Sequence, residues 1–121
     1  MSKAGQILNE TFNYSKWDIV HYTFMGLFKY IKKKGLLPSE KGTLGEGVYF
    51  WVSLPINRSD LHDEDELAIR IKPQYVSKIF NLEDYFDGYS DEEIKGAELV
   101  HDGKITPRYL EWLSPDGWVS L

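Results

Sequence analysis

Hydrophobic and polar positions divide this chain into short strand-like and helix-like segments. Residues Asp18–Phe24 are rich in β-branched and aromatic side chains, a composition that predicts a strand. From Leu27 apolar residues recur at near-helical spacing with lysines between them, which predicts a helix that ends at Gly35. Glu66–Ile71 alternates apolar and polar residues and predicts a half-buried strand. Further strands are expected at Gly47–Ser53, Ala97–His101 and Tyr109–Leu113, and a short helix at Pro73–Ile79.

These segments predict a single domain over residues 1–121. Asp102-Gly103 and Pro115-Asp116-Gly117 are turn signals that separate the last strands. Short strands dominate, and the connections are too brief for several parallel crossovers. We therefore expect an α+β fold with two small packed, mainly antiparallel sheets and one or two helices.

Composition excludes several classes of protein. Hydrophobic residues make up 42% of the chain and aromatic residues 15%, so it is not a largely disordered chain. It has no cysteine, which excludes disulfides, cysteine zinc sites and a cysteine nucleophile. The net charge of −5 argues against strong non-specific binding to nucleic acid, although a local basic patch can exist. No apolar run approaches the roughly 18 residues of a membrane span, and no signal peptide is evident. We expect a cytoplasmic protein that makes no membrane contact.

Three polar residues occupy separate predicted strands in the order histidine, tyrosine, glutamate. His21 lies in Val20-His21-Tyr22-Thr23, and Tyr49 lies in Gly45-Glu46-Gly47-Val48-Tyr49-Phe50. Glu98 opens Glu98-Leu99-Val100-His101-Asp102, which is followed by Tyr109-Leu110-Glu111-Trp112-Leu113. Each residue alone has an ordinary interpretation: a half-exposed strand histidine, a core tyrosine after a glycine bend, and a solvent-facing glutamate.

Together these motifs resemble the His-Tyr-Glu class of ADP-ribosyltransferases, the diphtheria-toxin-like and poly(ADP-ribose) polymerase type. The spacing is similar to that of a minimal bacterial or phage member, since the segments between the motifs are short. The resemblance implies that NAD is the substrate and that His21, Tyr49 and Glu98 are catalytic. It further implies that NAD contacts His21, Tyr22, Thr23, Tyr49 and Ser53. Two features depart from the family: Tyr22 stands where a glycine is usual, and no second tyrosine follows near Asn57–Asp60.

Each implied role has a physical basis. His21 would donate to a ribose hydroxyl, and the backbone of Tyr22 would hold the nicotinamide carboxamide. Tyr49 would stack on the nicotinamide ring, a flat aromatic cation. Glu98 would stabilise the positive charge that develops on the ribose as its bond to nicotinamide breaks. We therefore expect His21, Tyr49 and Glu98 to converge on one cleft from neighbouring strands.

The resemblance implies transfer of ADP-ribose to a macromolecular acceptor, as in toxins and effectors. The acceptor can be protein, DNA or RNA, and neither it nor a neutralising partner is identified by the sequence. Two alternatives stay open: an NAD glycohydrolase that uses water, and a degenerate, non-catalytic module that binds a nucleotide or a partner. An RNA 2′-phosphotransferase ranks behind them because the arginines, Arg58, Arg70 and Arg108, are not clustered in the sequence. No metal site is expected, since His62–Glu66 lacks the spacing of metal ligands.

Overall fold

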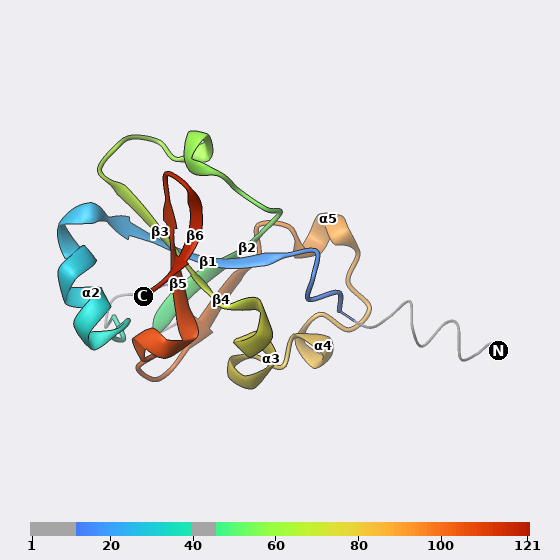
Figure 1. Cartoon of the computed structure of the whole chain (residues 1–121). Coiled ribbons are helices and arrows are strands. Elements are labelled where there is room, and N and C mark those ends of the chain that lie inside the picture. The colour runs from blue at the N-terminus through green and yellow to red at the C-terminus, as the bar shows by residue number, and fades with distance from the viewer. Residues whose placement is uncertain (1–11, 40–45) are drawn as a thin grey trace.

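The computed structural model describes residues 12–39 and 46–121 (Figure 1). Gly45 of the glycine-rich motif and Lys41 lie outside the described residues. The strands are β1 Asp18–Phe24, β2 Val48–Ser53, β3 Glu66–Ile71, β4 Glu98–His101, β5 Leu110–Ser114 and β6 Gly117–Ser120. The α-helices are α2 Phe28–Lys34, α3 Val76–Ile79, α4 Leu82–Tyr85 and α5 Asp91–Ile94. Single 3₁₀ turns occupy Met25–Leu27, Arg58–Asp60, Pro73–Tyr75 and Pro107–Tyr109.

The strands form one six-stranded sheet in the order β4-β2-β1-β3-β5-β6, and every pairing in it is antiparallel. The α+β class and the mainly antiparallel pairing are therefore confirmed. The expected division into two small sheets is replaced by a single sheet, and the described residues form four short α-helices where one or two were expected. β1 pairs with β2 along one edge and with β3 along the other, and so joins the two groups of strands.

The two faces of the sheet are covered differently. Ile19 of β1, Phe50 of β2 and Leu99 of β4 share one face, and they belong to the main core together with apolar residues from all four α-helices. We call this the helix face; in Figure 1, α3 and α4 lie close together below the strands, with α2 at the other end. Val20 and Ala68 belong to a smaller cluster on the opposite face. We call this the groove face, because it carries a surface groove lined by Tyr22 and Trp51.

Gly35 ends α2, as the sequence predicts. Its φ of +82° favours glycine, and a Cβ there would lie 2.1 Å from the carbonyl oxygen of Ile105. The backbones of Leu36 and Ile105 form a β-bridge at this point, so the chain after α2 is held against the segment that follows β4. Glycine is therefore required at position 35 for two reasons: the backbone at the end of α2 has a positive φ, and the backbone of Ile105 lies too close for a side chain.

Candidate functional site

The strands that carry the three motif residues are neighbours. Glu98 is on β4, Tyr49 on β2 and His21 on β1, and these strands are adjacent in the order β4-β2-β1. The expectation that the three residues come from neighbouring strands, although far apart in sequence, is therefore confirmed.

Tyr49 and Glu98 lie on the same face of the sheet. Trp51 pairs directly with Glu98, and Tyr49 pairs with Val100. Directly paired residues share a face, so Tyr49 and Glu98 are diagonal neighbours across two strands, a separation that long side chains can bridge. Val20 of β1 pairs with Trp51, which places all of these residues on the groove face. Tyr49 is buried, with 8% of its surface exposed.

His21 does not share that face, so the predicted convergence of all three side chains on one cleft is wrong for this residue. Strand side chains alternate between faces, and His21 follows Val20 by one position. It therefore shares the helix face with Ile19. Its ring lies edge-on to Phe50, with 5.9 Å between ring centroids.

The ring of His21 binds the backbone next to the site. Its Nδ1 lies 2.7 Å from the carbonyl oxygen of Tyr49. A carbonyl can only accept, so Nδ1 carries the proton. The pairing of β1 with β2 runs from Asp18–Ser53 to Val20–Trp51, and the next equivalent pair would be Tyr22 with Tyr49. The imidazole therefore donates a hydrogen bond to the backbone of Tyr49 just beyond Val20 and Trp51, the last pair of the β1–β2 ladder.

Burial lowers the pKa of His21 below its ordinary value of 6.5, and the hydrogen bond to Tyr49 opposes part of that effect. The folded protein therefore binds this proton less readily than the unfolded chain does. The stability associated with neutral His21 is present above pH 6.5 and is lost as the pH falls from 6.5 through the folded-state pKa.

Replacing His21 by glutamine should reduce the pH dependence of stability below pH 6.5. Urea unfolding of wild type and His21→Gln near neutral pH and near pH 5 measures this effect. The matched control is His62→Gln, because His62 is exposed. Equal losses of stability on acidification in wild type and His21→Gln would show that His21 is not the titrating group.

Two of the predicted NAD contacts line one groove on the groove face. The side chains of Tyr22 and Ser53 border a cavity of about 410 Å³ together with Trp51, Asp60 and Lys95. The rings of Tyr22 and Trp51 lie side by side, with centroids 6.4 Å apart and planes tilted by 53°. Burial raises the pKa of the Tyr22 hydroxyl, and the nearby carboxylates of Glu66, Asp60 and Asp18 add to this.

Sequence reasoning missed Trp51. Trp51 follows Tyr49 by two positions on one strand, so the two side chains share a face. Strand periodicity could therefore have predicted that Trp51 lies beside the candidate site. Thr23, the remaining predicted NAD contact, pairs with Leu67 and lies on the helix face. It therefore does not join Tyr22 at the groove.

Gly47 has a packing role that its place in the motif does not require. A Cβ at this position would lie 2.3 Å from Cγ2 of Val100 and 2.8 Å from the carbonyl oxygen of His101. The start of β2 therefore approaches β4 too closely for a side chain. This approach fixes the position of β2 against the strand that carries Glu98.

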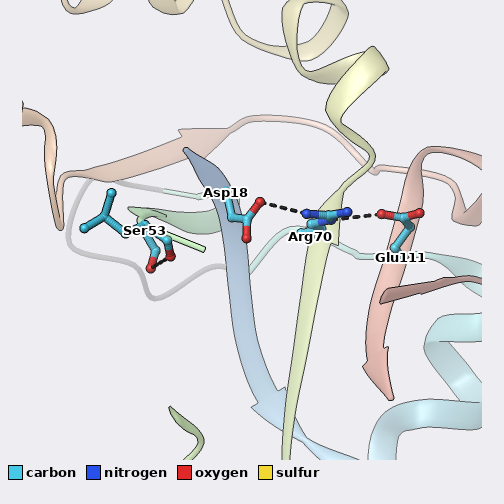
Figure 2. Close-up of polar contacts among 5 residues, drawn as sticks. Asp18, Ser53, Arg70 and Glu111 are labelled. Carbon is cyan, nitrogen blue, oxygen red and sulfur yellow. Dashed lines mark hydrogen bonds and ion pairs between the residues drawn. The ribbon is translucent and has the colours of Figure 1, made fainter. Parts of the chain in front are cut away.

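A row of charged side chains crosses the groove face beside the groove (Figure 2). Nη1 of Arg70 lies 2.8 Å from Asp18, and its Nε lies 2.9 Å from Glu111. The ring of Trp118 lies 4.5 Å from the guanidinium carbon. The second carboxylate oxygen of Asp18 is buried and has no hydrogen-bond partner among the described residues, and Asp18 pairs with Ser53 across the β1–β2 ladder. Arg70 thus links three adjacent strands and gives Glu111 a structural role.

Comparisons with protein-family models, with curated proteins and with solved structures find no match to this chain. Within residues 12–39 and 46–121, no helix combines the length and the apolar character needed to cross a membrane.

Proposed function

We propose that this domain is an NAD-dependent ADP-ribosyltransferase whose groove receives the nicotinamide riboside end of NAD. One observation supports this most. Tyr22 and Ser53, two residues that the family resemblance assigns to NAD, line a single groove with Trp51. The strand partner of Trp51 is Glu98, the proposed catalytic residue. A groove of about 410 Å³ is within the range usual for small-molecule sites.

The groove suits a flat aromatic cation. The rings of Tyr22 and Trp51 offer π-faces to the nicotinamide ring, an attraction of about 0.5–2 kcal/mol. The carboxylate of Asp60 also lines the groove and favours positive charge there, and Lys95 at its border opposes this. As the bond between nicotinamide and ribose breaks, nicotinamide leaves with the bonding electrons and the ribose becomes cationic. Glu98 would stabilise that charge until an acceptor oxygen or nitrogen, or water, forms the new bond.

His21 has a different role in this proposal from the one that the family resemblance implies. It lies on the helix face and donates to the carbonyl of Tyr49. It therefore acts as a positioning residue for β2 rather than as a ribose ligand in the groove. Tyr49, buried between the strands of Tyr22 and Glu98, is fixed by this hydrogen bond.

NAD should raise the melting temperature, because a ligand that binds only the native state stabilises it by about 2.7 kcal/mol at 100 times its Kd. Trp51→Ala and Tyr22→Ala should reduce this shift, because both residues line the groove, whereas Tyr22→Phe, which retains the ring, should preserve it. Differential scanning calorimetry with and without NAD gives the shift for each variant relative to its own ligand-free value. No shift in wild type at millimolar NAD would contradict NAD binding.

A second candidate function is a non-catalytic module that binds a nucleotide or a partner. The position of His21 on the face opposite Tyr49 and Glu98 favours it, since the three side chains do not share a cleft. Nicotinamide release from NAD separates the two candidates. Stabilisation by NAD without release supports the module, and release without a macromolecule present supports the glycohydrolase alternative. The acceptor, a neutralising partner and a cytoplasmic location stay predictions.

A further inference from the structure

A second cavity lies apart from the groove. It has a volume of about 230 Å³ and is formed by α3, the end of β4 and the segment that follows β4. His101 lines it and pairs with Val48, which places this residue on the helix face. The groove proposed for NAD is on the opposite face, so the two sites are separated by the sheet.

The polar lining of this cavity is basic and hydroxylic. The polar residues that line it are two lysines and a histidine, together with two residues that carry hydroxyl groups: Lys78, Lys104, His101, Thr106 and Tyr109. Among the described residues that line it, none carries a carboxylate; Asp102, next to His101, is exposed and outside the lining. Such a lining stands out in a chain whose net charge is −5. Two cations with neighbouring donors favour a ligand with concentrated negative charge.

The ring of His101 is held in place at one edge. Its Nδ1 lies 2.8 Å from the carbonyl oxygen of Gly103 and 3.2 Å from the backbone nitrogen of the same residue. The ring also lies edge-on to Phe80, with centroids 6.0 Å apart. A backbone contact and a packed aromatic neighbour together fix the imidazole within the cavity wall.

Cations and aromatic rings alternate on the surface beside the cavity. Nζ of Lys78 lies 5.8 Å from the ring of Tyr75, and the guanidinium of Arg108 lies 5.0 Å from the ring of Tyr109. The rings of Tyr75 and Tyr109 contact each other edge-on at 5.0 Å. A base attached to a bound phosphate would meet π-faces and cations here, the combination used by sites for nucleotides and single strands.

We propose that this cavity is a phosphate-binding site, with Lys78 and Lys104 as the cations and Thr106 as a hydroxyl donor. Its ligand is a phosphate group carried by a nucleotide or by a single-stranded nucleic acid. Arg108 and Tyr109 lie where the adjoining base would pack. The site does not depend on NAD cleavage, because none of its residues belongs to the groove.

Calorimetric titration tests this site with three probes: inorganic phosphate, adenosine monophosphate and a short single-stranded oligonucleotide. Lys78→Gln and Lys104→Gln should each weaken binding on the order of tenfold, the effect of one charge-assisted hydrogen bond. Both lysines are exposed, so the variants should fold, and circular dichroism checks this. The matched control is Lys32→Gln in the last turn of α2, which makes the same charge change outside the cavity.

The probes also identify the source of the phosphate. Tighter binding of adenosine monophosphate than of the oligonucleotide assigns a nucleotide. Tighter binding of the oligonucleotide, weakening steeply with salt, assigns a single strand. Absence of binding by all three probes overturns the proposal. So does equal weakening by Lys32→Gln and the two cavity variants, because the effect would then come from net charge alone.

Discussion

Replacing Arg70 by methionine is expected to lower the free energy of unfolding by about 3 kcal/mol. Arg70 binds Asp18 and Glu111 at once, and the three side chains are 18%, 9% and 19% exposed. Methionine fills much of the same space but leaves two carboxylates close together without their cation. The figure is at the lower end for loss of one partner of a buried ion pair, because the guanidinium keeps some contact with water. Urea unfolding at neutral pH measures it.

Two further variants decide whether the cause is electrostatic. Arg108→Met is the matched control, since Arg108 is exposed and contacts the ring of Tyr109; its effect should stay within about 0.5 kcal/mol. The triple variant Arg70→Met, Asp18→Asn, Glu111→Gln should recover most of the lost stability, because it removes the uncompensated charges. If the triple variant is as unstable as Arg70→Met, packing rather than charge explains the loss.

Replacing Glu98 by glutamine is expected to reduce nicotinamide release from NAD by about 10²–10³, or ~2.7–4 kcal/mol in the transition state. Glutamine keeps the size of the side chain and its capacity for hydrogen bonds but removes the charge. The carboxylate acts on charge that develops mainly in the transition state, so NAD affinity should change much less than turnover. Initial rates of nicotinamide release and calorimetric titration of NAD separate the two quantities.

Glu111→Gln is the control for this experiment. Glu111 lies on the same face of the sheet as Glu98, but on β5, where it pairs with Arg70. Its loss should lower stability while turnover per folded molecule stays nearly intact. If activity survives in Glu98→Gln and disappears in Glu111→Gln, the catalytic carboxylate lies on β5, and its assignment to β4 is wrong. An inactive wild type that is still stabilised by NAD would favour the non-catalytic module.

Local sequence patterns were sufficient for most strands. Asp18–Phe24 and Glu66–Ile71 have the predicted bounds, because each carries a dense apolar pattern that only a strand can bury. No helix was expected in the acidic stretch between positions 84 and 93, which contains the end of α4 and the start of α5. Ser90 and Glu93 form a reciprocal capping box at α5, a sequence signal that was available but overlooked.

The candidate site could be predicted from the sequence only in part. The family resemblance implied that His21, Tyr49 and Glu98 come from neighbouring strands, and they do. Their faces depend on register between strands, which a single sequence does not reveal. A shift of one residue moves a side chain to the other face, and His21 follows Val20, the partner of Trp51, by one position. The groove beside Trp51 likewise depends on loops that meet only in the folded chain.

By itself the sequence determined the α+β class, the approximate positions of β1 to β5 and the end of α2 at Gly35, because these follow from side-chain periodicity and backbone preferences within a few residues. The tertiary structure alone decided that β1 joins all strands into one sheet, that Arg70 binds carboxylates from β1 and β5, and that His21 faces the helices. It also brought Lys78 and Lys104 to one cavity. These features depend on contacts between residues distant in sequence, and their geometry is set by strand order and register.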